Sequence, residues 1–251
     1  MLDVIANVKI DESKPERVKM FIASLRSCYF LNSGMKIIIN LDNPSQELYE
    51  KVYRELFSSN IDFNLTQTKK DNRSYGEIYT ELIELYSKNN YILNFIEDHF
   101  FVIDSQIKIY MLLSEMDKYN IDVCKSTFFQ VEQNSIKDAG IDFIQNNNYG
   151  FIFENNRLNF EKYQRYYVTR YYIGVNFITT KKFALKFWNR PNIKDKRPHP
   201  YEIACFDRNW LHNCIIPNIE IQASIDDNHG EPKTCLLERN VDKFRKIWSN
   251  L

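Results

Sequence analysis

The sequence predicts an α/β fold, in which helices flank a mainly parallel central sheet and the C-terminal half is less regular. Three observations predict it. Apolar runs of strand length recur in the first half, segments with helical spacing of apolar residues lie between them, and polar turns separate the two. This alternation is typical of a parallel sheet, because parallel neighbours need crossover connections, usually helices. The 251 residues are enough for one large domain.

In the first half, strands and helices alternate in order. The predicted strands are Asp3–Ile10, Met35–Leu41, Ile61–Thr66 and Tyr91–Ile96. Between and after them, helices are predicted from the segment that follows Ser13 to Cys28, from Ser45 to about Phe57, through Ile78–Leu85, and from about Ser105 to Lys118. We expect Ser13 to cap the first helix, with Pro15 in its first turn, where a backbone N–H is not needed.

The second half shows weaker patterns. The predicted strands are Ile121–Gln130, Tyr149–Phe153 and Tyr171–Thr179, and the predicted helices are Lys181–Trp188, Tyr201–Asn213 and about Val241–Trp248. No internal repeat or composition shift marks a domain boundary. The sequence therefore predicts a single domain over residues 1–251.

Composition excludes several classes of protein. Lys plus Arg and Asp plus Glu number 33 each, so the chain has no overall charge to attract nucleic acid. The P-loop, Rossmann and nucleophile-elbow glycine motifs are absent. The five cysteines form no C-x-x-C pair, the N-terminus does not read as a secretory signal, and no apolar run is long enough to span a membrane. We expect a cytoplasmic protein.

The acidic end of the strand Tyr91–Ile96 is the most informative feature. Glu97, Asp98 and His99 follow this apolar run directly. The carboxyl ends of parallel strands are where open α/β sheets bind ligands, and carboxylates there can hold a divalent cation and, through it, a diphosphate. A solvated polar turn that ends a strand is the other interpretation.

Four segments, in order, resemble the nucleotide-sugar-dependent glycosyltransferases of the GT-A fold. They are the start from Val4 to Tyr29 with its Ser24-Leu25-Arg26-Ser27, the loop Asp71–Gly76, the acidic segment Phe95–Phe100, and Gly174–Leu185 followed by Pro200-Tyr201-Glu202. The resemblance implies a GT-A-like domain whose residues 1–104, approximately, bind the nucleotide sugar. Residues from about 105 to 251 then form the acceptor-side half and the tail.

The resemblance also implies site residues. The residues implied to bind the nucleotide-sugar donor are Asp11, Asp71, Arg73, Tyr75, Glu97 and Asp98. A divalent cation, Mn²⁺ or Mg²⁺, is expected on Asp98, with His99 and the late His229 as further candidates. His99 stands where the family has a second acid. It can therefore ligate a softer ion, hydrogen-bond the phosphate, or indicate transfer without a metal.

An inverting transfer needs a base for the acceptor hydroxyl. Glu202 follows Pro200-Tyr201, where the family has an acid after a Pro-aromatic pair. Asp207 lies five residues on, about 140° around a helix, so the two side chains do not face one small site. Glu202 is the preferred base, and Asp207 is the alternative.

These features together indicate a glycosyltransferase acting on a glycan or glycolipid hydroxyl, with a UDP-sugar as the favoured donor. The resemblance implies surface or capsular polysaccharide synthesis. Arginines and tyrosines of residues 157–172 suit an acceptor cleft or a membrane surface, so the inner face of the membrane is a candidate location. A strand and its edge with ordinary amphipathic tyrosines is the other interpretation of this segment. The alternatives are a non-catalytic glycan- or partner-binding module and a sugar-1-phosphate nucleotidyltransferase. No feature specifies the oligomeric state.

Overall fold

The computed structural model describes residues 1–29, 34–69, 72–95, 97, 99–101, 106–118, 120–125, 152–154, 157–159, 166–168, 177–189, 214–217 and 221–224. Its helices are α1 (Pro15–Ser27), α2 (Gln46–Ser58), α3 (Tyr75–Tyr86), α4 (Gln106–Lys118) and α6 (Lys181–Trp188). Its strands are β1 (Leu2–Val8), β2 (Lys36–Asp42), β3 (Asp62–Thr68), β4 (Tyr91–Asn94), β5 (His99–Phe101), β6 (Val123–Lys125), β7 (Ile152–Glu154), β8 (Arg157–Asn159), β9 (Tyr166–Val168), β10 (Phe177–Thr180), β11 (Cys214–Pro217) and β12 (Gln222–Ser224).

Among the described residues, the main sheet has eight strands in the order β3-β2-β1-β4-β10-β6-β11-β9. The first four are parallel neighbours, which confirms the predicted β-α alternation of the first half. β10 then runs antiparallel between β4 and β6. The sheet is therefore purely parallel where the N-terminal half builds it and mixed beyond β4.

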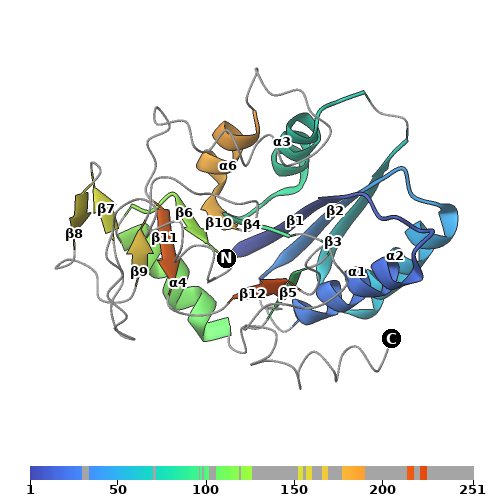
Figure 1. Ribbon diagram of the computed structural model, residues 1–251, viewed down its shortest axis with the longest axis horizontal. Coiled ribbons are helices and arrows are strands. Elements are labelled where there is room, and N and C mark those ends of the chain that lie inside the picture. Colours follow the sequence, from blue (N-terminus) through green and yellow to red (C-terminus); the bar gives the residue numbers. More distant parts are fainter. Residues whose placement is uncertain are drawn as a thin grey trace.

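Helices cover both faces of this sheet, with α1 and α2 on one face and α3 and α6 on the other (Figure 1). Alternation along β1 explains the two layers. Val4, Ala6 and Val8 pack in the core with α1, α2 and α4, whereas Ile5 packs in the core with α3 and α6. Because successive strand residues point to opposite faces, a continuous apolar run is what a strand between two helical layers requires.

Local signals explain most helix starts, with one correction. Ser74 and Glu77 form a capping box at α3, and Ser45 caps α2. The predicted Ser13 cap is wrong: α1 begins after Lys14 without a side-chain cap, and the Ser13 hydroxyl donates to Asp11 Oδ1 at 2.6 Å. Because the Ser13 hydroxyl bonds the nearby Asp11 carboxylate, Ser13 does not cap the helix.

Two strand predictions are refined. β4 ends at Asn94 rather than Ile96, and His99–Phe101 forms the separate strand β5, which pairs with β12 in a second sheet. β3 extends two residues past the predicted Thr66. The predicted helices at residues 201–213 and 241–248 lie outside the described residues. In the part of the chain described, no helix is long and apolar enough to cross a membrane.

Candidate functional site

The strand order reverses between β1 and β4. β1, β2 and β3 follow one another in one direction across the sheet. After α3, β4 lies on the other side of β1. Open α/β sheets bind ligands outside the carboxyl ends of the two strands at such a switch point. The loop after β1, which contains Asp11, and the acidic turn after β4 both leave the sheet at this edge.

The acidic turn, residues 95–99, is held on both sides by aromatic packing. The rings of Phe95 and Phe101 stack with their centroids 6.0 Å apart, and Phe95 also lies 6.2 Å from Phe21 of α1. The backbone N–H of Phe101 donates to Ser27 Oγ at 2.7 Å. Phe95 and Phe101, which flank the turn, are therefore both anchored on α1.

The acidic turn contains a partly exposed Glu97, and His99, at its end, is 8% exposed. Carboxylate and imidazole groups in one turn offer oxygen and nitrogen ligands, and carboxylate oxygen suits Mn²⁺ or Mg²⁺. Ile96 and Asp98 lie outside the described residues, so the predicted role of Asp98 stays a prediction. Among the described side chains, no group of three or more His, Cys, Asp or Glu is arranged to hold a metal.

The C-terminal part of the chain returns to the acidic turn. β12 pairs antiparallel with β5, and Ser224 lies opposite His99. The segment after Ser224 therefore starts beside the turn. His229 is five residues on, within about 17 Å of extended chain. His229 itself lies outside the described residues.

The loop after β1 is organised by its own carboxylates. Asp11 accepts the Ser13 hydroxyl and lies 3.5 Å from Lys14 Nζ, and the Ser13 hydrogen bond lowers the Asp11 pKa. Glu12 accepts the backbone N–H of Ser45 at 2.7 Å and also bonds its hydroxyl, which ties this loop to the start of α2. Asp11 stays exposed at the switch point, so its predicted donor contact is sterically open.

The start of α3 holds the other predicted donor residues. The guanidinium of Arg73 forms an ion pair with the carboxylate of Glu81. Tyr75 is 7% exposed and packs 5.3 Å from Trp188 and 5.8 Å from Tyr79. This packing makes Tyr75 a core residue, and a contact between Tyr75 and a base stays a prediction. Asp71 lies outside the described residues.

No protein-family model matches the sequence, and no curated protein does. Solved structures resemble its fold. S. aureus TarS 1-349 matches with a TM-score of 0.54 at 10% identity, over 88% of this chain and 59% of that one. Its complex with UDP gives 0.53 at 8% identity, over the same shares of the two chains. HddC from Yersinia pseudotuberculosis gives 0.53 at 13% identity, over 97% of this chain and 100% of that one.

The chain has a GT-A-like fold. At these identities the likeness concerns the fold alone, and the chain spans 59% of the TarS chain that it matches. The predicted α/β fold class and the predicted GT-A-like fold are thus confirmed.

The GT-A-like sheet carries a polar network that the sequence reasoning did not single out. It lies toward the carboxyl ends of β1, β2 and β3. Asn40 Nδ2 donates to Asn7 Oδ1 at 2.8 Å and to Thr68 Oγ1 at 3.2 Å, while Thr66 Oγ1 donates to Asn40 Oδ1 at 3.0 Å. The Thr68 hydroxyl lies 3.4 Å from Asp42 Oδ1. In the sequence, this network is visible only as polar residues at the ends of apolar strand runs.

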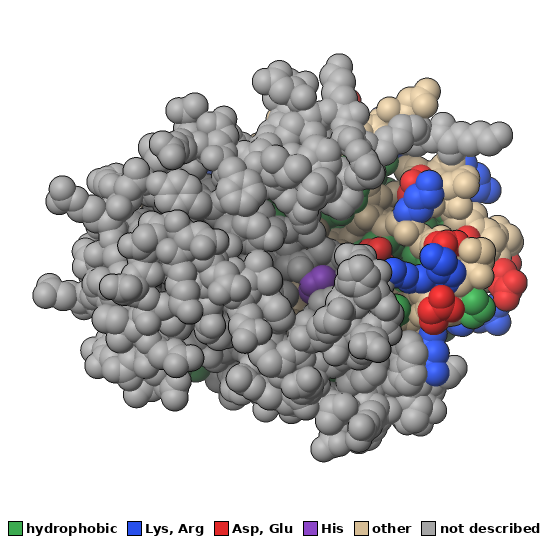
Figure 2. Space-filling model, in the orientation of Figure 1, with side chains coloured by type: hydrophobic (Ala, Val, Ile, Leu, Met, Phe, Trp, Pro, Cys, Tyr) green, Lys and Arg blue, Asp and Glu red, His purple; other side chains and the backbone are tan. Residues whose placement is uncertain are grey.

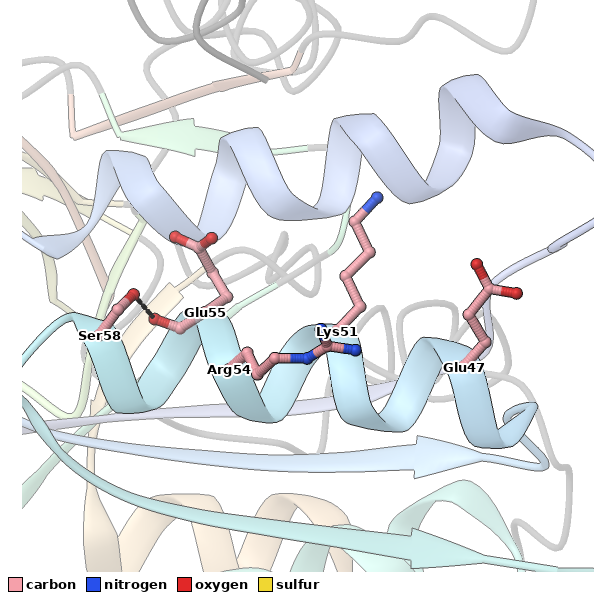
Figure 3. A pocket seen from close by; sticks show the side chains of 5 residues that line it. All are labelled: Glu47, Lys51, Arg54, Glu55 and Ser58. Carbon is pink, nitrogen blue, oxygen red and sulfur yellow. Dashed lines mark hydrogen bonds between the residues drawn. The ribbon is translucent and has the colours of Figure 1, made fainter.

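A shallow groove of about 430 Å³ lies elsewhere on the GT-A-like domain. Its lining comes entirely from α2, on the side toward α1: Glu47, Lys51, Arg54, Glu55 and Ser58 (Figure 3). Both charge signs are present, and Glu55 is already bound by Arg26 of α1 through two hydrogen bonds of 2.7 and 2.8 Å. Side chains of both signs also gather over this part of the molecule in Figure 2. We therefore interpret the groove as part of the contact surface between α1 and α2 and not as the candidate donor site.

The acceptor-side predictions are untested by the geometry. Glu202 and Asp207 lie outside the described residues. The described part thus brings Asp11, Glu97 and His99 to one sheet edge, together with the start of α3 that carries Arg73.

Proposed function

We propose that this chain is a glycosyltransferase that moves a sugar from a nucleoside diphosphate onto a hydroxyl of a glycan or glycolipid. The observation that carries the proposal is the acidic turn at the β1/β4 switch point of a GT-A-like fold, with β12 paired beside it. A UDP-sugar is the favoured donor, and UDP is the ligand named for one TarS structure. A role in surface or capsular polysaccharide synthesis at the cytoplasmic face of the membrane belongs to the same proposal.

On the donor side, Asp98 and Glu97 would hold Mn²⁺ or Mg²⁺, and His99 and His229 would complete the set or bond the diphosphate. Such an ion offsets the charge that develops on the departing diphosphate. The partly exposed Glu97 carboxylate fits the oxygen preference of these ions. Transfer without a metal would leave this task to cationic groups such as Arg73, which would have to exchange Glu81 for phosphate.

The nucleoside would lie over the carboxyl ends of β1 to β3. Asp11 and Asp71 lie in the loops after β1 and β3, and Asp42 ends β2 next to the polar network. Carboxylate and amide groups there can accept from ribose hydroxyls and base N–H groups. On the acceptor side, Glu202 would act as the base, with Asp207 as the alternative.

Calorimetry with nucleotides tests this proposal. We expect UDP to bind the full chain more tightly with Mn²⁺ than with EDTA, because the diphosphate binds through the ion. We also expect UDP to bind more tightly than GDP or CDP, because the proposed donor is a UDP-sugar. Binding of UDP independent of Mn²⁺ would favour the metal-free mechanism. No nucleotide binding at all would favour the glycan-binding module, and product formation from a sugar 1-phosphate and a nucleoside triphosphate would favour the nucleotidyltransferase.

His229→Ala is expected to weaken UDP binding by about 1–3 kcal/mol, the cost of losing a hydrogen bond to a charged group. The thermal midpoint of the free protein should hardly change. His229 is chosen because the chain leaves β12 directly opposite His99. Unchanged UDP affinity in the variant, measured with Mn²⁺ present, would remove His229 from the site.

A further inference from the structure

Tyr79 carries a polar group deep inside the domain. The residue has no solvent exposure, and its side chain lies in the core between α3 and α6, 4.5 Å from the ring of Trp188. Its hydroxyl lies 2.7 Å from the backbone oxygen of Ile5 and also bonds Asn94 Oδ1. Both partners are carbonyl oxygens, so the hydroxyl is the donor and shares its one proton between them.

These two acceptors belong to different strands. Ile5 lies on β1, Asn94 is the last residue of β4, and the two are direct partners in the parallel register. The Ile5 oxygen also accepts the backbone N–H of Phe95 at 2.9 Å, the first bond beyond β4. The Tyr79 hydroxyl therefore bridges β1 and β4 at the switch point, immediately before the acidic turn begins.

Packing alone does not explain this hydroxyl. A phenylalanine would fill the same aromatic environment, and a buried hydroxyl has a desolvation cost that only hydrogen bonds offset. Burial raises the Tyr79 pKa far above its ordinary value, so the group stays a donor at any working pH. The same helix begins one turn earlier at Tyr75, where Ser74 caps it next to Arg73. One hydroxyl thus connects α3, β1 and the origin of the acidic turn.

We propose that Tyr79 is a positioning residue for the donor site: its hydroxyl fixes the direction in which the chain leaves β4, and with it the placement of Glu97 and His99 relative to the loop after β1. The proposal rests on the proposed function of this site. Tyr79 itself would touch neither donor nor metal, since no part of it is exposed. Removing groups that orient ligand-bearing residues typically costs 10–100-fold in metal affinity or activity.

The test compares Tyr79→Phe with a matched control, Tyr91→Phe. Tyr91 is the first residue of β4, is also buried, and its hydroxyl bonds Asp117 and lies 3.4 Å from the backbone oxygen of Leu113. Both variants delete one hydrogen-bonded tyrosine hydroxyl, but at opposite ends of β4: the Tyr79 hydroxyl bonds Asn94, the last residue of the strand, and Tyr91 is its first residue. We expect both to lower the thermal midpoint, because each removes a buried hydrogen bond.

Only Tyr79→Phe should affect the donor site. At a temperature where all proteins are folded by circular dichroism, we expect it to weaken Mn²⁺-dependent UDP binding at least ~10-fold, while Tyr91→Phe stays within about twofold of the wild type. Replacing Tyr79 by 4-aminophenylalanine, which restores a donor for both oxygens, should recover the affinity. If Tyr79→Phe does not fold, Asn94→Leu removes one of the two hydrogen bonds, that to Asn94 Oδ1, from the strand side and should also weaken Mn²⁺-dependent UDP binding.

The outcomes separate this inference from the proposed function. A wild type that binds UDP with Mn²⁺, together with a folded Tyr79→Phe variant of unchanged affinity, would overturn the positioning role alone. Equal losses in Tyr79→Phe and Tyr91→Phe would do the same, because they would reflect stability. A wild type that binds no nucleotide would overturn the proposed function, and the positioning role with it.

Discussion

Asp98→Asn is expected to lower donor turnover at least ~100-fold, a loss of about 2.7 kcal/mol of transition-state stabilisation, without unfolding the protein. The asparagine keeps the size of the side chain but removes the negative charge that would hold a cation at the diphosphate. Asp98 follows the buried strand β4 at the β1/β4 switch point, between the described residues Glu97 and His99. Steady-state kinetics with UDP-sugar hydrolysis as the readout, and circular dichroism for the fold, measure both parts.

Asp62→Asn is the matched control for this variant. Asp62 begins β3, at the amino end of the sheet and so at the edge opposite the candidate site, and its carboxylate lies 3.4 Å from Lys88 Nζ. Both side chains of that pair are well exposed, so the substitution should cost at most about 1 kcal/mol of stability and leave turnover unchanged. Wild-type turnover in a folded Asp98→Asn variant would remove Asp98 from the donor site.

Glu202→Gln is expected to have the second large effect, a fall in kcat of about 100-fold or more, which is the usual contribution of a general base. UDP affinity should stay nearly unchanged, because a base acts on the acceptor hydroxyl in the transition state and not on the diphosphate. The expectation holds for an inverting reaction, and the position of Glu202 after Pro200-Tyr201 motivates it. Single-turnover rates and UDP calorimetry on the same variant separate the two quantities.

Asp207→Asn is the direct comparison. Asp207 lies on the same predicted helix but about 140° around it, so only one of the two carboxylates is expected at the acceptor hydroxyl. If Asp207→Asn abolishes transfer while Glu202→Gln remains active, Asp207 takes the role of the base. If both variants transfer at the wild-type rate, neither residue is the base.

The sequence predicts those parts of the site that are formed by residues close together along the chain. The sequence predicts the acidic turn because Glu97 and His99 follow an apolar run directly, and it predicts α3 from the helical spacing of Ile78, Leu82 and Leu85. The polar network around Asn40 was missed, because its partners lie 26 to 33 residues away along the chain. Nothing in one strand's sequence says which residue of the next strand it will face.

The sequence by itself determined the succession of strands and helices in the N-terminal half, since burial on two faces requires continuous apolar runs and the helices between them show helical spacing of apolar residues. Only the tertiary structure decided that β4 returns beside β1, that β12 pairs with β5, and that Tyr79 bonds Ile5 and Asn94 at separations of 74 and 15 residues. These pairings depend on backbone and side-chain hydrogen bonds between distant segments. Their free energy comes from packing the whole domain, so no single segment encodes them.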